Sequence, residues 1–196
     1  TMGKMIELTA SDGHKLAAYR ADASGANAAK PRGAIVVIQE IFGVNSHIKA
    51  VTDGFAADGY LAIAPAMFDR VQKNFDVGYT PPDIEKGRAL RAKITVDMAM
   101  KDAQAAIDAV KGAGKVGIVG YCWGGFVAWM AASRLAGFAC AVPYYGGGML
   151  DAVGGFGERH EVDRLHQAAR RVPPAHERLE ADDRAGRQRH DRLEVQ

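Results

Sequence analysis

The sequence predicts an α/β fold in which helices cover both faces of a mostly parallel sheet. Four short runs of apolar residues have the length and the character of strands that are buried on both faces. Segments with helical spacing of apolar residues separate these runs, and strands that alternate with helices indicate a parallel sheet. The length of 196 residues, 48% of them hydrophobic and 24% charged, fits one globular domain of ordinary size.

The N-terminal part predicts a hairpin followed by the first buried strand. Residues 5–22 alternate roughly between apolar and polar residues around the turn signal Ser11-Asp12-Gly13, which predicts two antiparallel strands. Residues 24–32 are small and polar and contain a proline, so we expect a surface loop there. The run 34–38 is apolar and rich in β-branched residues, which predicts a strand buried on both faces.

The next segment predicts a helix, a second buried strand and an irregular excursion. We expect Ser46 to cap a helix that continues to about Asp58, where Gly59 would stop it. Residues 60–65 predict the second buried strand. Residues 69–82 have no clear period and contain a Pro-Pro pair, so we expect them to form a loop above the sheet.

Two further strands and two helical segments complete the periodic part of the chain. Residues 83–111 predict a helix, in one or two pieces, and residues 116–121 predict the third buried strand. A helix over 126–135 and a fourth buried strand over 140–145 follow. The residues of the 83–111 segment that we expect to face the core are Leu90, Ile94, Met98, Ile107 and Val110.

The composition of the chain changes after Phe156. All 15 aromatic residues lie at or before this position, whereas the 40 residues beyond it contain no Lys, nine Arg and nine acidic residues. Two explanations fit this tail: genuine divergence into a charged helix, or a reading-frame change near residues 153–156, which we favour because GC-rich DNA read out of frame yields arginine. We expect a core over 1–156 that lacks its final strands, and a tail over 157–196 that is out of frame or disordered.

Charge and composition exclude several classes of function. A net charge of +2 is too small to indicate a nucleic-acid partner. No apolar run is long enough to span a membrane, and the first ten residues lack an apolar signal core, so we expect a cytoplasmic protein. Cys122 and Cys140 are too few for a disulfide framework, and His14 and His47 are isolated, so we expect no metal site.

The motif Gly120-Tyr121-Cys122-Trp123-Gly124-Gly125 carries the strongest chemical signal. It lies where a predicted buried strand meets a helix, which is the setting of a nucleophile elbow. We expect the turn to lift Cys122 to the carboxyl end of the sheet and to aim the N–H of Trp123 at a developing oxyanion. We also expect the helix N-terminus to favour the thiolate of Cys122. The alternative is an inert buried thiol at the end of a core strand.

A second motif, residues 39–45, follows the first buried strand and would reach the same edge of the sheet. Its carboxylate, Glu40, is expected to be paired or functional if it is buried there, and the alternative is a solvated loop residue. Ile41 would offer the second N–H of an oxyanion hole, because this loop supplies one in folds with a nucleophile elbow.

Residues 39–45 and 120–125 together closely resemble the dienelactone hydrolase (carboxymethylenebutenolidase) family. The stretches 59–65 and 144–146 fit the same pattern, so the resemblance covers about residues 5–150. It implies an α/β-hydrolase fold, a cysteine nucleophile, a small lactone or ester as substrate, and no cofactor.

The resemblance also implies roles for individual residues. Cys122 corresponds to the nucleophile, and Glu40 to the glutamate that holds the resting thiol and then helps to activate it. Ile41 and Trp123 correspond to the oxyanion donors. The family uses arginines to hold a carboxylate of the substrate, and Arg88 is our choice among the candidates Lys86, Arg88 and Arg91.

The acid and the base of a catalytic triad are not identifiable in the sequence. In the family an Asp follows the next buried strand, and a His follows a further strand in a Gly-His turn. After Tyr145 there is neither a β-branched apolar run of sufficient length nor a Gly-His pair, and His160 stands where the Asp is expected. On composition alone the tail offers Asp163, His166, His176 and His190.

Two hypotheses of function follow. The first is a hydrolase that opens an unsaturated lactone, or cleaves a related ester, by thiolate attack. The second is a catalytically defective domain that keeps the fold and the elbow and acts only in binding or thiol chemistry. A dinucleotide site at Gly112–Gly117 is set aside, because this glycine pattern ends a helix and opens a strand, the reverse of what such a site requires.

Overall fold

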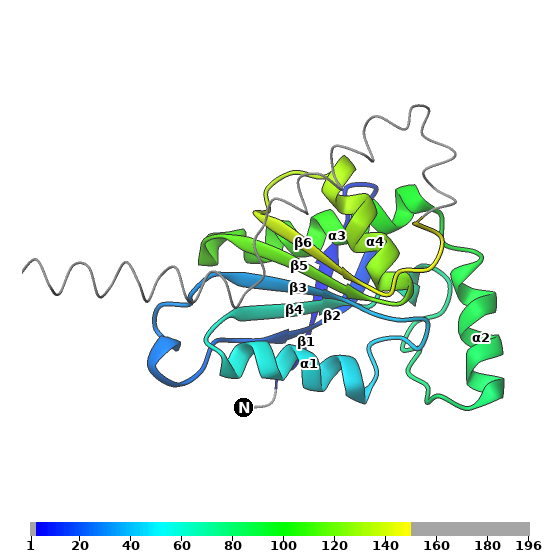
Figure 1. Ribbon diagram of the computed structural model, residues 1–196, viewed down its shortest axis with the longest axis horizontal. Coiled ribbons are helices and arrows are strands. Elements are labelled where there is room, and N and C mark those ends of the chain that lie inside the picture. The colour runs from blue at the N-terminus through cyan, green and yellow to red at the C-terminus, as the bar shows by residue number, and fades with distance from the viewer. Residues whose placement is uncertain (1–2, 150–196) are drawn as a thin grey trace, which may run out of the picture. The chain divides into compact units, whose positions relative to one another are not determined.

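The structure is a computed structural model that describes residues 3–149, and its centre is a six-stranded sheet in the order β1-β2-β4-β3-β5-β6 (Figure 1). The strands are β1 (Lys4–Thr9), β2 (Lys15–Ala21), β3 (Ala34–Ile38), β4 (Leu61–Pro65), β5 (Val116–Tyr121) and β6 (Cys140–Tyr144). β1 and β2 form the predicted antiparallel hairpin, and β2 also pairs antiparallel with β4. The other three pairings are parallel, with Val37 of β3 opposite Val119 of β5. The predicted sheet is therefore confirmed.

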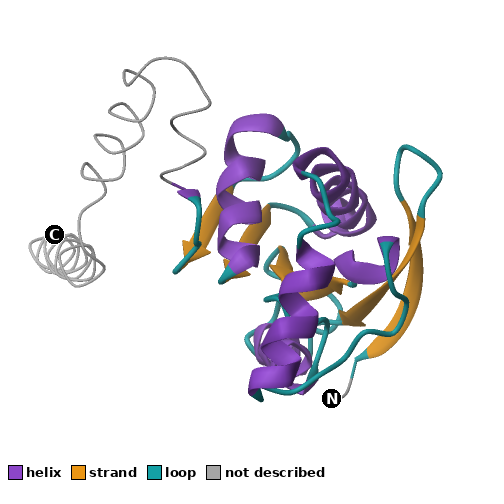
Figure 2. Ribbon diagram, turned by 90° about the vertical axis from the view of Figure 1, so that its right-hand side faces the viewer, coloured by secondary structure: helices purple, strands orange, loops and turns teal. Residues whose placement is uncertain are grey.

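Helices cover both faces of this sheet, as predicted. They are α1 (Ser46–Ala57), α2 (Pro81–Arg91), α3 (Val96–Val110) and α4 (Trp123–Arg134). Figures 1 and 2 show α1 on one face and α3 with α4 on the other, while α2 lies beyond the carboxyl ends of the strands. The core under α1 joins Tyr19, Val37, Ile48 and Val119 from four different elements. None of the helices within residues 3–149 combines the length and the apolarity that a membrane span requires.

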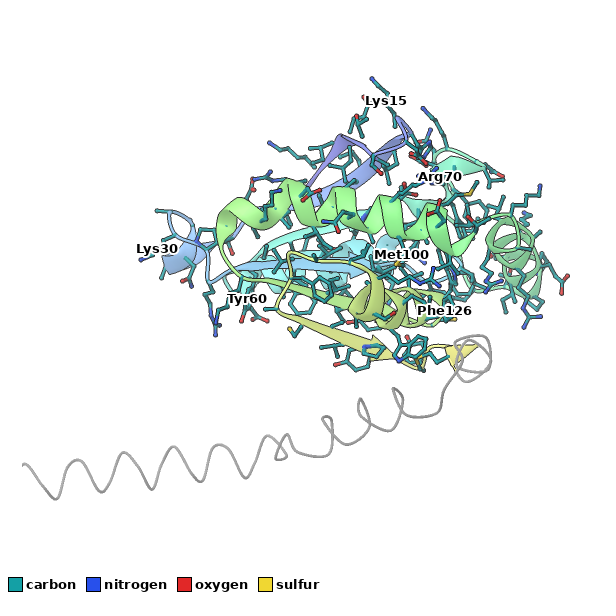
Figure 3. All side chains as sticks on the ribbon, turned by 90° about the horizontal axis from the view of Figure 1, so that it is seen from above. Lys15, Lys30, Tyr60, Arg70, Met100 and Phe126 are labelled. Atoms are coloured by element: carbon teal, nitrogen blue, oxygen red, sulfur yellow. The ribbon has the colours of Figure 1, made fainter. Side chains whose placement is uncertain are left out.

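Three details of the helices differ from the prediction. Asn45, not Ser46, caps α1, because its side chain is placed to accept a hydrogen bond from the N–H of Ile48. α4 begins at Trp123, three residues before the predicted start, because its first turn lies directly on the elbow. In α3, Met98 is only half-buried whereas Met100 is buried, on the side of the sheet that also carries Phe126 of α4 (Figure 3).

The segment 83–111, predicted as a helix in one or two pieces, forms two helices. α2 ends at Arg91, and α3 begins after Thr95, whose side chain accepts a hydrogen bond from the N–H of Met98. Because Thr95 caps a separate helix, α3 has its own axis. α3 can therefore pack on the sheet while α2 extends away from it.

β6 is not a buried strand, which corrects the prediction for residues 140–145. Four of its five residues are exposed, Cys140 among them, and Val142 and Tyr144 are 43% and 47% exposed. The reason is position, because β6 is the last strand of the sheet in residues 3–149 and pairs there only with β5. The predictions for the tail over 157–196 fall outside the described residues.

A buried ion pair fixes the segment after β4 to α3. The guanidinium of Arg70 donates to both carboxylate oxygens of Asp102, at 2.9 and 2.7 Å, and also binds Asp12 in the hairpin turn. The Asp102 side chain is fully buried, and burial raises its pKa although Arg70 acts in the opposite direction. The pair joins three segments of chain that are distant in sequence.

Candidate active site

Cys122 lies in a strained turn between β5 and α4. Its backbone has φ 53° and ψ −119°, a conformation that residues with a Cβ rarely adopt. Its N–H donates to the carbonyl oxygen of Tyr144 at 3.1 Å, and its own carbonyl accepts from the N–H of Gly125 at 2.9 Å. Strain of this kind persists only where the surroundings fix it, and it clusters at functional sites. The geometry is that of a nucleophile elbow, as the motif predicts.

Glycine is required at three positions around the elbow because neighbouring backbone occupies the space of a side chain. A Cβ at Gly120 would meet the carbonyl oxygen of Gly124, and a Cβ at Gly124 would meet the carbonyl oxygens of Ile38 and Gln39. A Cβ at Gly125 would meet the carbonyl oxygen of Tyr144. Rigid backbone cannot move aside as a flexible side chain can. The glycines therefore allow the elbow to sit close to the ends of β3 and β6.

Glu40 lies at the end of β3 and is only 9% exposed. The hydroxyl of Tyr79 donates a 3.1 Å hydrogen bond to its Oε2, and the hydroxyl of Tyr145 is 3.5 Å from its Oε1. Hydrogen bonds satisfy a carboxylate that is removed from water. Of the two alternatives that the sequence left open, the structure therefore has the paired carboxylate and not the solvated one, and the partners of Glu40 are phenols rather than cations.

The two residues predicted as oxyanion donors follow Glu40 and Cys122 in the chain. α2 packs against the first of them, since a Cβ at Gly87 would meet the carbonyl oxygen of Ile41. The second, Trp123, is 6% exposed and its ring lies 5.2 Å from that of Phe68. Its backbone N–H acts to lower the pKa of the Cys122 thiol. Gln39, fully buried, secures the loop by accepting from the N–H of Met67 at 3.1 Å.

The helix N-terminus was expected to favour the thiolate of Cys122, but other effects on the pKa of this thiol act in the opposite direction. Burial raises the pKa of the Cys122 thiol, and the negative charge of Glu40 raises it further. The hydrogen bond from Trp123 and the positive charge of Arg88 lower the pKa but do not compensate. Desolvation by burial is the largest of these effects on the pKa of the thiol, and the sequence pattern of a helix N-terminus gives no sign of it. The net effect favours the thiol form of Cys122, which is the resting form that the family resemblance implies.

The site brings together four of the predicted residues, which are Cys122, Glu40, Trp123 and Arg88. Of the three cationic candidates on α2, Arg88 is the one whose charge acts on Cys122, whereas Lys86 lines a cavity of about 440 Å³ with Asp76 and Val77. The candidates for the triad acid and base in the tail lie outside the described residues. Within residues 3–149 no group of three or more His, Cys, Asp or Glu residues could hold a metal ion.

Tyr79 and Tyr145, the two partners of Glu40, have no role that the sequence predicts. Tyr79 lies in a segment without periodicity, so no pattern indicated where its side chain would point. Tyr145 was visible as part of the Tyr144-Tyr145-Gly146 strand end, but only the fold shows that this end faces Glu40. Its left-handed backbone, φ 39°, has no signal in a single sequence.

The chain is similar to known proteins of one family. The model of the dienelactone hydrolase family matches residues 16–172. A Synechocystis protein provisionally named carboxymethylenebutenolidase is 40% identical over 120 residues, which are 59% of this chain and 48% of that protein. The carboxymethylenebutenolidase of Pseudomonas putida is 32% identical over 153 residues, which are 74% of this chain and 61% of the relative.

Solved structures show the same fold. A Klebsiella pneumoniae protein provisionally called a dienelactone hydrolase superposes with a TM-score of 0.59 at 29% identity, over 73% of this chain and 60% of that one. This chain spans about half to three fifths of the length of the curated relatives named above. The family match extends over more than half of the 196 residues and includes both site motifs. The chain belongs to the dienelactone hydrolase family.

Proposed function

We propose that this chain carries the nucleophile of a hydrolase that opens an unsaturated lactone or cleaves a related carboxylic ester, with Cys122 as the attacking group. The observation that carries the proposal is the strained backbone of Cys122, which puts a thiol on a turn enclosed by three glycines at the carboxyl end of a parallel sheet. The family relationship supports the same class of substrate. We also propose that the protein acts in the cytoplasm, as the sequence predicts.

The proposed reaction begins with transfer of the Cys122 proton to a base. Glu40 takes part in this proton transfer. The thiolate sulfur attacks the carbonyl carbon of the substrate, a C–S bond forms, and the carbonyl electron pair moves to oxygen. The N–H groups of Ile41 and Trp123 hold this oxyanion. The carbonyl then re-forms as the bond to the ring or alkoxy oxygen breaks, and that oxygen takes up a proton. A thioester remains on Cys122.

Water completes the proposed cycle. It attacks the thioester carbon and gives up a proton to a base, and the C–S bond then breaks to release the carboxylic acid and regenerate Cys122. The described residues contain two histidines, His14 in the hairpin turn and His47 on α1, and the groups that shift the pKa of Cys122 include neither. A histidine base for this step is therefore proposed to lie outside residues 3–149.

Arg88 is proposed to bind an anionic group of the substrate. Its charge acts on the Cys122 thiol from α2, the helix that packs against Ile41. An arginine can hold a carboxylate through two parallel hydrogen bonds. A substrate anchored in this way would carry a carboxylate a few ångströms from the carbonyl group under attack.

The raised pKa of the Cys122 thiol favours a second candidate function. A thiol whose pKa is raised and that has no imidazole among the described groups that act on it also fits a catalytically defective domain, one that binds the same ligands or reacts slowly with electrophiles.

Hydrolysis of a small lactone and of p-nitrophenyl acetate by the full 196-residue chain separates the two functions. The hydrolase predicts steady turnover that Cys122→Ala abolishes and Cys140→Ala leaves intact. Alkylation of Cys122 by iodoacetamide without any turnover would reject the hydrolase and support the defective domain.

A further inference from the structure

Tyr79 is exposed, yet its hydroxyl is directed into the protein. The residue is 53% exposed, and its ring packs against that of Phe42 with the centroids 4.5 Å apart. The hydroxyl donates to Oε2 of Glu40 at 3.1 Å and accepts a hydrogen bond from Nδ2 of Asn45 at 3.3 Å. A phenol on a free surface would instead direct its hydroxyl to water. Both the donor and an acceptor position of this hydroxyl are used inside the site.

The backbone fixes the position of Tyr79 without any help from Glu40. The N–H of Val77 donates to the carbonyl oxygen of Phe42 at 3.2 Å, and Gly43 forms an antiparallel bridge with Asp76. The segment before α2 is therefore hydrogen-bonded to the loop that follows Glu40. A side chain held on such a frame can orient a mobile partner, because its own position does not depend on that partner.

Asn45 fixes the direction of the two hydrogen bonds that run from Asn45 to Tyr79 and from Tyr79 to Glu40. Its side chain is buried at 2% exposure, and its Oδ1 accepts from the N–H of Ile48, where it caps α1. With the oxygen used by the cap, the amide nitrogen must face the other way, where it donates to the carbonyl oxygen of Val77 and to the hydroxyl of Tyr79. Since the amide can only donate to Tyr79, the single hydroxyl proton of Tyr79 is left for Glu40.

We propose that Tyr79, oriented by Asn45, is a positioning residue that holds the carboxylate of Glu40 at a fixed place within range of Cys122. Tyr145, the residue after β6, assists, but its contact with Oε1 is 3.5 Å long and the residue is 65% exposed, so Tyr79 provides the stronger restraint. Tyr79 does not touch the reacting atoms. It acts through Glu40.

The ionisation of Cys122 reports on this restraint. The charged and titratable groups that act on Cys122 are Glu40 from the loop after β3 and Arg88 from α2. The Cys122 thiol in turn raises the pKa of Tyr145, which follows β6. A carboxylate held in place exerts its full repulsion on a thiolate, whereas one that is free to turn toward water is screened. Release of Glu40 is therefore expected to make Cys122 easier to ionise.

This inference rests on the proposed function, because the position of Glu40 matters for the reaction only if Cys122 is the nucleophile. The experiment measures alkylation rather than turnover, so the inference and the proposed function can fail separately. The rate at which iodoacetamide modifies Cys122 is followed from pH 6 to pH 11 by peptide mass spectrometry in the full chain, with exposed Cys140 as an internal reference. The variants are Tyr79→Phe, Glu40→Gln, both together, and Tyr60→Phe as a control tyrosine that packs on Arg32 instead.

We expect the effects of the Glu40 and Tyr79 substitutions on the pH midpoint of alkylation to be fully coupled. Glu40→Gln lowers the pH midpoint of alkylation by about one pH unit. Tyr79→Phe lowers it in the same direction by about half as much, and Tyr60→Phe leaves it unchanged. In the Glu40→Gln background Tyr79→Phe has no further effect, because the group on which it acts has lost its charge.

Two results would overturn the proposal. One is an unchanged midpoint in Tyr79→Phe, and the other is a shift of equal size with and without the Glu40 carboxylate, which would make the effect of Tyr79 merely structural. Phenylalanine keeps the ring contact with Phe42 and loses only the hydroxyl, and an unchanged thermal unfolding midpoint verifies that the variant is folded. A protein that shows the predicted coupling but hydrolyses no ester would retain this inference and lose the proposed function.

Discussion

The carbonyl oxygen of Tyr144 accepts a 3.1 Å hydrogen bond from the N–H of Cys122. The same carbonyl occupies the space that a Cβ at Gly125 would need. The last residue of β6 thus holds the elbow through its backbone, while the side chains of Tyr144 and Tyr145 are exposed. The position of Cys122 is set by main chain on both sides, by β6 here and by the end of β3 at Gly124.

The reactivity of Cys122 is expected to rise steeply with pH. Because burial and Glu40 raise the pKa of its thiol above the ordinary value, the reactive thiolate is scarce at pH 7 and accumulates only as the pH passes that raised value. Alkylation by iodoacetamide is therefore expected to accelerate at least about tenfold between pH 7 and pH 9. A midpoint below about pH 8 would contradict the dominance of desolvation at this site.

Replacement of Arg88 by Gln is expected to slow the same alkylation. The positive charge of Arg88 lowers the pKa of Cys122, so its removal raises that pKa and reduces the thiolate fraction at pH 8 by about twofold to threefold. Arg88→Lys keeps the charge and is expected to retain most of the rate. Lys86→Gln and Arg91→Gln are matched controls on the same helix, and an equal slowing in either would show a general charge effect rather than one specific to Arg88.

Gly124→Ala is expected to damage the fold, whereas Gly54→Ala is not. An added methyl group at Gly124 would collide with the carbonyl oxygens of Ile38 and Gln39, so we expect a loss of about 2 kcal/mol or more in the free energy of unfolding. Gly54 lies inside α1 with open space around the added carbon, and alanine there is expected to stabilise by about 0.5 to 1 kcal/mol. Urea unfolding of both variants measures the contrast, and equal effects would disprove it.

Asp102→Ala is expected to lower the free energy of unfolding strongly, because Asp102 is the buried partner of Arg70. It would leave the guanidinium of Arg70, only 8% exposed, with Asp12 alone as its partner, at a loss of about 3 kcal/mol. Asp97→Ala is the control, because this residue is 74% exposed and its ion pair with Lys101 contributes about 0.5 kcal/mol at most. Chemical denaturation should separate the two variants clearly, and a small effect at Asp102 would indicate that water reaches Arg70.

The sequence predicted the architecture because burial leaves a strong pattern. The strands 34–38 and 116–121 coincide with β3 and β5, since a strand covered on both faces is apolar throughout. The elbow was predictable because only glycine fits at Gly120, Gly124 and Gly125, and this requirement is written directly in the sequence. Local steric demands and complete burial can thus be inferred without coordinates.

Other features depend on contacts between distant segments and left no such pattern. The exposure of β6 follows from its place at the edge of the described sheet, which its apolar composition concealed. The raised pKa of Cys122 follows from desolvation by several elements at once, and the helix N-terminus alone suggested the opposite. The contact of Tyr79 with Glu40 joins residues 39 positions apart, through a loop whose path no periodicity indicates.

The most direct test of the account is detection of a covalent acyl group on Cys122. The full chain is mixed with p-nitrophenyl acetate at pH 9, quenched within seconds in acid, digested, and mapped by mass spectrometry. Attack by the Cys122 sulfur on the ester carbonyl with release of p-nitrophenolate predicts an acetyl thioester on the Cys122 peptide, well in excess of that on Cys140 and absent from Cys122→Ala. Equal acetylation of Cys122 and Cys140, or acetate release that persists in Cys122→Ala, would contradict the assignment of Cys122 as the nucleophile.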